Sequence, residues 1–178
     1  ISILHDVARE LIRSSREIKK ANQKDIAFAR RHGLSGAMID RLLLDEARIT
    51  AMADAAGDVA RLPDPIGVIQ KRWRRPNGLE IKRVTVPLGV ILVIFESRPN
   101  VTNECASLCL KSANSVILRG GKEALHSNVA IADVYRRVYR RHQIPEAACS
   151  VVATTAHSDV DRLLEMDDLI HLVIPRGG

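Results

Sequence analysis

Residues 1–64 place apolar side chains at the three- and four-residue spacing of amphipathic helices. The first stripe on one helical face consists of Leu4, Val7, Ala8, Leu11, Ser15 and Ile18. Gly33 interrupts the pattern as an expected C-terminal cap, and Ser35 is placed to cap a short following helix. Asp45 can cap a further helix, whose apolar face carries Ile49, Met52, Ala56 and Val59. The sequence therefore predicts a helical N-terminal region that ends at the prolines of "LPDPIG".

Residues 65–86 change to the pattern of β-strands. Two strand-like runs, "IGVIQKRWRR" and "LEIKRVTV", flank the turn residues Pro76, Asn77 and Gly78. A turn of this composition between two such runs indicates a β-hairpin. The alternation of apolar and polar positions is imperfect, so the sequence predicts the hairpin but leaves its register open.

Residues 87–178 alternate between apolar runs and helical patterns. The runs "GVILVIFE", "SVILR", "CSVVA" and "LIHLVI" are apolar enough for strands that are covered on both faces. Helices are expected after Pro99, over residues 127–142 and over "SDVDRLLEM". Strands joined by helical crossovers form an open α/β sheet whose strands are mostly parallel. Ligands of such sheets bind outside the carboxyl ends of the strands.

The predicted strand ends carry residues suited to a negatively charged ligand. They read "FESRPN", "LRGGKE" and "IPRGG", and each combines arginine with turn-forming residues. Glycine lets backbone N–H groups approach an anion, and arginine offers paired hydrogen bonds to phosphate or carboxylate. We therefore expect a phosphorylated ligand, most simply a nucleotide; the alternative is that the glycines only turn the chain. Neither GxGxxG nor a complete P-loop occurs, which disfavours an ordinary Rossmann dinucleotide site.

Composition and charge narrow the class of protein. Of the 178 residues, 46% are hydrophobic and 27% are charged, as in ordinary globular proteins. The longest apolar run, Val90 to Phe95, is far shorter than the roughly 20 residues that span a bilayer, so no membrane partner is expected. The net charge of +6 includes basic runs at 71–75 and 136–141. Such runs are usually solvated faces, and with only 3% aromatic residues for base stacking we expect no nucleic-acid partner.

The three cysteines indicate a reducing compartment. Cys105, Cys109 and Cys149 are too few and too irregularly spaced for a disulfide framework. Cys105 and Cys109 would share one face of a helix, which allows a metal pair in principle. No CxxC or HxxxH pattern accompanies them, and free cysteine is among the most buried residue types. We expect all three to pack in the core, with no metal site and no catalytic residue among them.

Four longer stretches carry more specific information. They are "GLSGAMIDRLLLDEARITAMA" (33–53), "VPLGVILVIFESRPNVT" (86–102), "LKSANSVILRGGKEALHSN" (110–128) and "DLIHLVIPRGG" (168–178). In this order they closely resemble the gamma-glutamyl phosphate reductases, a family of the aldehyde dehydrogenase superfamily, and "ESRPN", "LRGGKEA" and "IPRGG" are specific to that family. Ala113 departs from the family, which usually has glycine before Asn114, and a tighter turn is expected there.

The resemblance implies an activity and a fold. The family reduces L-glutamyl 5-phosphate with NADPH to L-glutamate 5-semialdehyde and phosphate, the second step of proline biosynthesis. A cysteine thiolate displaces phosphate to give a thioester, which hydride from the nicotinamide reduces. The resemblance also implies that residues 87–178 form a Rossmann-like NADP-binding domain of the aldehyde dehydrogenase type, after the helical region and the hairpin.

The resemblance assigns binding residues to the three strand ends. The adenosine end of NADPH, with its 2′-phosphate, is expected at Arg119, Gly120, Gly121 and Lys122. The pyrophosphate and nicotinamide are expected near Pro175, Arg176, Gly177 and Gly178. The junction of cofactor and substrate is expected at Ser97, Arg98 and Asn100.

The family's nucleophilic cysteine belongs to a catalytic domain that is expected to begin soon after residue 178. None of the three cysteines here matches its motif, so the 178-residue chain alone is expected to be inactive. The resemblance further implies a homo-oligomer, with residues 65–86 as an oligomerisation ribbon, a cytoplasmic location and functional coupling to glutamate 5-kinase. The alternative from another class is a naturally short, non-catalytic nucleotide-binding module.

Overall fold

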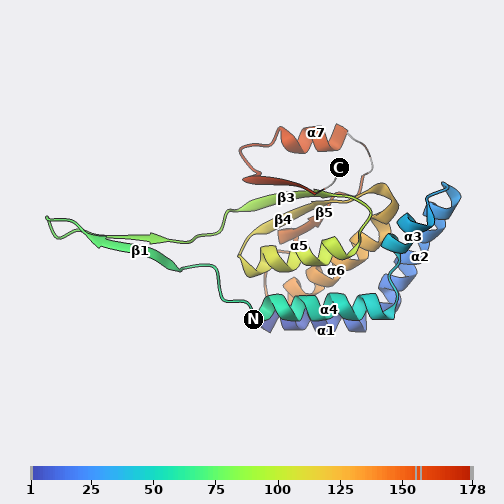
Figure 1. Cartoon of the computed structure of the whole chain (residues 1–178), viewed down its shortest axis with the longest axis horizontal. Coiled ribbons are helices and arrows are strands. Elements are labelled where there is room, and N and C mark those ends of the chain that lie inside the picture. The colour runs from blue at the N-terminus through green and yellow to red at the C-terminus, as the bar shows by residue number, and fades with distance from the viewer. Residues whose placement is uncertain (1, 155, 157, 177–178) are drawn as a thin grey trace.

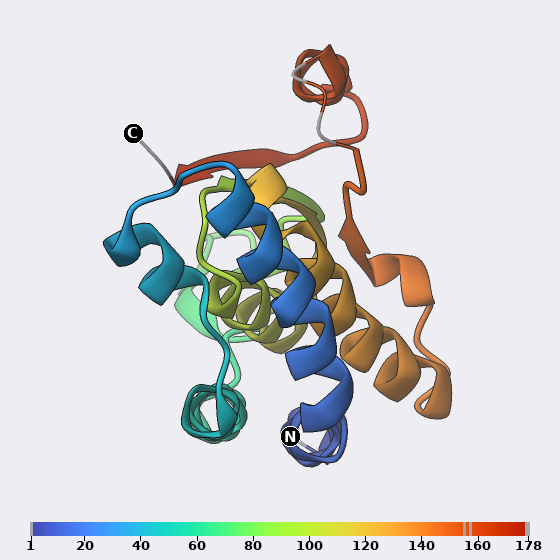
Figure 2. The same ribbon diagram turned by 90° about the vertical axis from the view of Figure 1, so that its right-hand side faces the viewer.

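The computed structural model describes residues 2–154, 156 and 158–176. Its N-terminal part consists of the helices α1 (Ser2–Arg13), α2 (Ser15–Arg31), α3 (Gly36–Leu42) and α4 (Glu46–Arg61). The stripe expected on one helical face is divided between α1 and α2, which run in different directions from a bend at Ser14 (Figure 2). Serine pairs such as Ser14 and Ser15 are among the usual causes of helix kinks.

The predicted helix ends of this region are confirmed. Gly33 has a φ of +67° and ends α2 with the paired backbone hydrogen bonds of a Schellman motif. The Ser35 hydroxyl accepts a hydrogen bond from the Met38 N–H at 3.3 Å at the start of α3. The Asp45 carboxylate accepts one from the Arg48 N–H at 2.8 Å at the start of α4. These local signals explain why the elements begin and end where they do.

The predicted hairpin is formed by β1 (Ile69–Arg74) and β2 (Glu80–Val84), which pair antiparallel with Trp73 opposite Ile81. Gly78 in its turn has a φ of +88°, a conformation that glycine adopts readily. The hairpin projects from the rest of the molecule (Figure 1), and all of its strand residues except one are exposed. The ribbon therefore contributes little to the apolar core.

The described residues form a parallel sheet in the order β5-β4-β3-β6, from β3 (Val90–Phe95), β4 (Ser115–Arg119), β5 (Cys149–Val151) and β6 (Leu172–Arg176). The central strand β3 pairs on both sides. From β3 the chain proceeds outward through β4 to β5 and then returns to place β6 on the other side of β3. This reversal makes the carboxyl ends of β3 and β6 the topological switch point, the usual ligand position in open α/β sheets.

Helices cover both faces of this sheet (Figure 1). α5 (Asn100–Lys111) and α6 (Leu125–Arg141) lie on one face, and α7 (Ser158–Leu164) lies on the other. The 3₁₀ turns η1 (Lys122–Ala124) and η2 (Glu146–Ala148) lead into α6 and β5. α1 and α4 pack against the outer side of α5 and α6, so the N-terminal helices and the sheet share one apolar core. The predicted α/β class with a mostly parallel sheet is confirmed.

Helix α6 begins without a capping side chain of its own, and α2 supplies one. The Asp25 carboxylate accepts hydrogen bonds from the Ser127 N–H at 2.7 Å, the Ser127 hydroxyl at 2.6 Å and the His126 N–H at 3.1 Å. Burial raises the pKa of the Asp25 carboxyl, and these hydrogen bonds oppose that shift. The neighbouring Asn22 accepts a hydrogen bond from the Leu44 N–H at 2.9 Å. Two buried side chains of α2 therefore hold the start of α6 and the segment after α3.

Ala113 lies in the turn between α5 and β4, at a position where the family that the sequence resembles usually has glycine. Its φ is +54°, a left-handed conformation that costs a residue with a Cβ roughly 1–2 kcal/mol. The turn still closes, because the Asn114 N–H donates to the Cys109 carbonyl at 2.8 Å. Alanine at this position therefore adds backbone strain and leaves the path of the chain intact.

Candidate functional site at the switch point

A cavity of about 300 Å³ lies at the switch point between the carboxyl ends of β3 and β6. Its lining comes from four parts of the chain: the end of β3 with the loop after it, the start of α5, the end of β6, and α3. The polar and charged members are Arg41, Glu96, Ser97, Arg98 and Arg176. The structure therefore brings together Ser97, Arg98 and Arg176, which the sequence assigned to two different strand ends.

Ser97 and Arg98 have different roles at this cavity. Ser97 is buried, and its hydroxyl donates a hydrogen bond to the carboxylate of Glu123. Because Glu123 follows β4, this hydrogen bond ties together the carboxyl ends of two neighbouring strands. Arg98 is exposed, and within the described part of the chain its guanidinium has no hydrogen-bond or ionic partner. Arg98 is thus available to a ligand, whereas Ser97 holds the loop.

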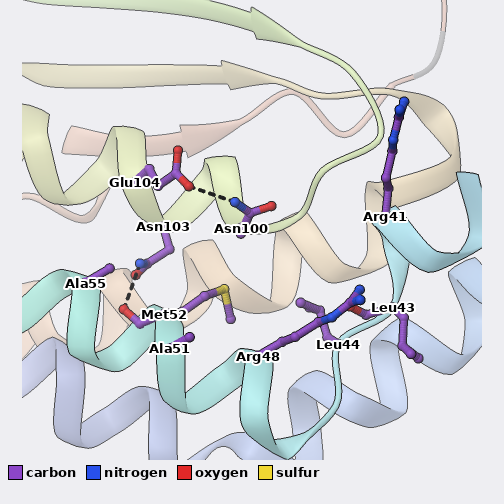
Figure 3. Close-up of a pocket in the computed structure, with 10 residues that line it drawn as sticks. All are labelled: Arg41, Leu43, Leu44, Arg48, Ala51, Met52, Ala55, Asn100, Asn103 and Glu104. Atoms are coloured by element: carbon purple, nitrogen blue, oxygen red, sulfur yellow. Dashed lines mark hydrogen bonds between the residues drawn. The ribbon is translucent and has the colours of Figure 1, made fainter. Parts of the chain in front are cut away.

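Asn100 lines a neighbouring cavity of about 320 Å³ between α4, α5 and the residues that follow α3 (Figure 3). Its side-chain amide donates a hydrogen bond to Glu104 at 2.7 Å. The other carboxylate oxygen of Glu104 pairs with the Arg176 guanidinium at 3.0 Å. Arg41 lines both cavities. The residues predicted for the substrate end are therefore divided between two adjoining cavities.

Internal packing explains Gly120 of "LRGGKE" better than it explains Gly121, whose nearest neighbour is the end of the Glu123 side chain. A Cβ on Gly120 would overlap the side chain of Asn128 and lie 3.1 Å from the Phe95 ring. A Cβ on Gly121 would overlap the carboxylate of Glu123. Neither glycine has a positive φ, so the turn does not require their conformational freedom. The small size of Gly120 lets β4, α6 and the loop after β3 approach each other, so packing is one reason for glycine at this position.

The two cations of this segment differ in exposure. Arg119 is the last residue of β4, is only 8% exposed, and donates a hydrogen bond to the Gly120 carbonyl. Lys122 begins η1 and is exposed, with no hydrogen-bond or ionic partner in the described part of the chain. Of the two, Lys122 is better placed to meet a bound anion.

The segment "IPRGG" differs from the prediction. Pro175 and Arg176 are the last residues of β6, opposite Ile94 and Phe95 of β3, so the strand begins and ends later than the run "LIHLVI" indicated. Both residues therefore belong to the strand itself and lie at its carboxyl end. Proline fits here because β6 lies at the edge of the described sheet, where a ladder hydrogen bond is dispensable. Gly177 and Gly178 lie outside the described residues.

The cysteines lie in the core, as predicted. Cys109 and Cys149 are buried, and Cys105 packs against the same cluster. Burial raises the pKa of Cys105 to about 11 and the pKa values of Cys109 and Cys149 to about 12. Each is therefore a neutral thiol near pH 7, and the thiolate is the nucleophilic form. The described residues contain no cluster of three or more side chains suited to a metal ion.

We expect a thiol-reactive probe to label the folded chain slowly at all three cysteines. With pKa values of about 11 to 12, the thiolate fraction at pH 7 is on the order of one in ten thousand or less. Labelling followed by mass spectrometry should place Cys105 first, and denaturant should release all three. Rapid labelling of one cysteine in the folded chain, with protection by substrate, would contradict the structural role.

The two basic runs differ in their contacts and location in the structure. The arginines of the run at 136–141 pair with acidic side chains of α1, α2, α6 and η2, at distances from 2.7 to 3.5 Å. The run at 71–75 lies on the exposed hairpin, where Lys71 sits over the Trp73 ring at 5.7 Å. Within the described residues, no helix combines the length and apolar character needed to cross a membrane.

Sequence reasoning missed Arg41, Glu104 and Glu123. Glu104 follows Asn100 by one helical turn, a spacing that could have indicated the observed hydrogen bond. Arg41 gave no such signal, because nothing in its local sequence shows that α3 lies at the carboxyl edge of the sheet. Glu123 adjoins a predicted site residue and was overlooked for the same reason, since its partner Ser97 comes from another strand end.

The sequence of this chain is similar to those of several known proteins. No protein-family model matches the chain. The gamma-glutamyl phosphate reductase of Geobacter sp. strain M21 is 48% identical over 99% of this chain, and that of Geobacter metallireducens is 49% identical over 99%. The chain spans only 42% of the length of either relative.

Solved structures agree with the sequence comparison. The crystal structure of gamma-glutamyl phosphate reductase from Thermotoga maritima matches 99% of the chain with a TM-score of 0.96 and 41% identity, over 42% of its own length. A protein from Listeria monocytogenes described as a "probable aldehyde dehydrogenase" matches 96% of the chain with a TM-score of 0.68 at 14% identity, over 35% of its own length, which shows a shared fold. The chain is thus homologous, over almost all of its length, to about two-fifths of a gamma-glutamyl phosphate reductase and has the corresponding part of the aldehyde dehydrogenase fold.

Proposed function

We propose that this chain is the helical and cofactor-binding part of a reductase that converts L-glutamyl 5-phosphate and NADPH to L-glutamate 5-semialdehyde, phosphate and NADP, the second step of proline biosynthesis. The observation that carries the proposal is 46–49% identity to gamma-glutamyl phosphate reductases over nearly the whole chain. Residues 1–64, 65–86 and 87–178 would then be the helical region, the ribbon and the NADP-binding domain. The cysteine environments support a nucleophile supplied from outside this chain.

The cofactor would lie along the carboxyl edge of the sheet. When bound, NADPH supplies the hydride that reduces the acyl carbon. The exposed Lys122 after β4 and the exposed Arg176 at the end of β6 are cations at two points of that edge, which fits a ligand with phosphates at two places. Arg119 and the glycines would shape the adenosine end, and Ser97, Arg98 and Asn100 would face the substrate.

A homo-oligomer is proposed on the evidence of the hairpin. Its strands expose apolar side chains such as Ile69, Trp73 and Val84, and an isolated two-stranded ribbon is marginally stable in water. Contact with a second copy would cover these side chains. Coupling to glutamate 5-kinase and a cytoplasmic location stay predictions from the resemblance.

The decisive experiment compares the full-length gene product with the 178-residue chain. The gene product is expected to release phosphate and form semialdehyde as NADPH is oxidised. The chain alone is expected to form none, because its three thiols pack in the core and are protonated near pH 7. Semialdehyde formation by the purified chain would contradict this assignment. A gene product that binds NADPH and reduces no acyl phosphate would instead support the non-catalytic module.

A further inference from the structure

Arg41 is placed between the two cavities of the candidate site. It extends from α3 toward the carboxyl ends of the strands, apart from the other residues drawn in Figure 3. Arg41 lines the cavity at the switch point and also the cavity that contains Asn100 and Glu104. It is exposed, and across the described residues it has no hydrogen-bond or ionic partner.

The neighbouring Arg48 has a purely structural role. Its guanidinium donates to the Leu43 carbonyl at 3.0 Å and pairs with the Asp40 carboxylate at 2.7 Å, so it holds the connection between α3 and α4. Arg41 makes no such contact with its surroundings. The contacts that hold the connection between α3 and α4 therefore account for the presence of arginine at position 48 but not at position 41.

Charge at the switch-point cavity favours an anion. Arg41, Arg98 and Arg176 line it, against the single carboxylate of Glu96. Arg176 already pairs with Glu104, whereas Arg41 and Arg98 have no partner within the described part of the chain. Two unpartnered guanidinium groups on one cavity suit a group with several oxygens and more than one negative charge, because each can donate two parallel hydrogen bonds.

We propose that Arg41, with Arg98, binds the phosphoryl group of the acyl phosphate substrate in the switch-point cavity. This inference rests on the proposed function and names the residues that recognise its substrate. The remainder of the substrate extends past Arg41 into the adjoining cavity, whose polar lining includes the Asn100 amide and the Glu104 carboxylate, already hydrogen-bonded to each other. The N-terminal helical region thus supplies a binding residue to a site otherwise built by the sheet.

Inorganic phosphate tests the cavity directly in the 178-residue chain. Titration followed by the amide NMR signals of Ser97 and Arg98, at constant ionic strength, should show saturable binding. Arg41→Ala is expected to weaken it roughly tenfold, the value of one charge-assisted contact. Arg41→Lys should retain part of the affinity, because it keeps the charge and loses the paired donors. Arg72→Ala, which removes the same charge from the exposed hairpin, should leave it unchanged.

The full-length gene product separates this inference from the proposed function. Arg41→Ala is expected to raise KM for L-glutamyl 5-phosphate roughly tenfold and to leave the Kd for NADPH unchanged. If the enzyme is active and Arg41→Ala changes neither KM nor phosphate binding relative to Arg72→Ala, the inference is overturned and the proposed function stands. If the gene product reduces no acyl phosphate while phosphate binding still requires Arg41, the anion site stands and the proposed function fails.

Discussion

Replacing Asp25 with alanine is expected to lower the free energy of unfolding of the chain by about 3 kcal/mol. Asp25 is 1% exposed, and its carboxylate accepts hydrogen bonds from the His126 and Ser127 N–H groups and from the Ser127 hydroxyl. Alanine would leave buried donors at the first turn of α6 without a partner, and such donors cost about 1–3 kcal/mol each.

The measurement is urea unfolding at pH 7, with a thermal scan as a second readout. A loss of this size lowers the melting temperature of a chain of this length by roughly 6–12 °C. Asp45→Ala is the matched control, because Asp45 caps α4 from an adjacent, exposed position and its loss should cost only about 1 kcal/mol. Equal effects of the two substitutions would show that the cap supplied from α2 adds nothing to an ordinary local cap.

Replacing Lys122 with alanine is expected to weaken NADPH binding by the full-length gene product roughly tenfold to hundredfold and to change NADH binding little. The 2′-phosphate distinguishes the two cofactors, and a contact between a lysine ammonium and a phosphate contributes about 1.5–3 kcal/mol. Lys122 is the exposed cation at the carboxyl end of β4, whereas Arg119 beside it is largely buried.

The ratio of the two dissociation constants, measured by the fluorescence of the reduced cofactors, is the readout. Lys82→Ala is the control, since it removes a lysine charge from the exposed hairpin, away from the sheet. If the ratio is the same in Lys122→Ala and the unaltered protein, Lys122 does not recognise the 2′-phosphate. Arg119 would then be the residue to change next.

The elements of this fold were predictable because their signals are local. The apolar runs that became β3 and β4, the hairpin turn at Gly78 and the caps at Gly33, Ser35 and Asp45 each depend on a few adjacent residues. The bend at Ser14 escaped prediction because one continuous stripe fits both a single helix and two helices at an angle.

The site was predictable only in part, because cavities depend on which distant segments meet. The sequence identified Ser97, Arg98 and Arg176, since strand ends carry their own signal. It missed Arg41 and Glu123, because the packing of α3 and of the turn after β4 against the loop after β3 is decided by the whole core. The role of Gly120 was ambiguous in the sequence, because a glycine needed for packing and a glycine needed for ligand binding look the same there.

The pairing of β3 with β6 determines when the site can exist. Ile91 lies opposite Leu172, so the two strands that border the switch-point cavity are separated by the entire β4–β5 segment of the chain. Contacts between such distant segments form slowly, and synthesis releases the N-terminal part of the chain first. Helices α1 to α6 and strands β3 to β5 can therefore pack before β6 has left the ribosome, while Arg176 cannot yet reach Glu104. Among the described residues, the cavity therefore cannot be completed until β6 has paired with β3.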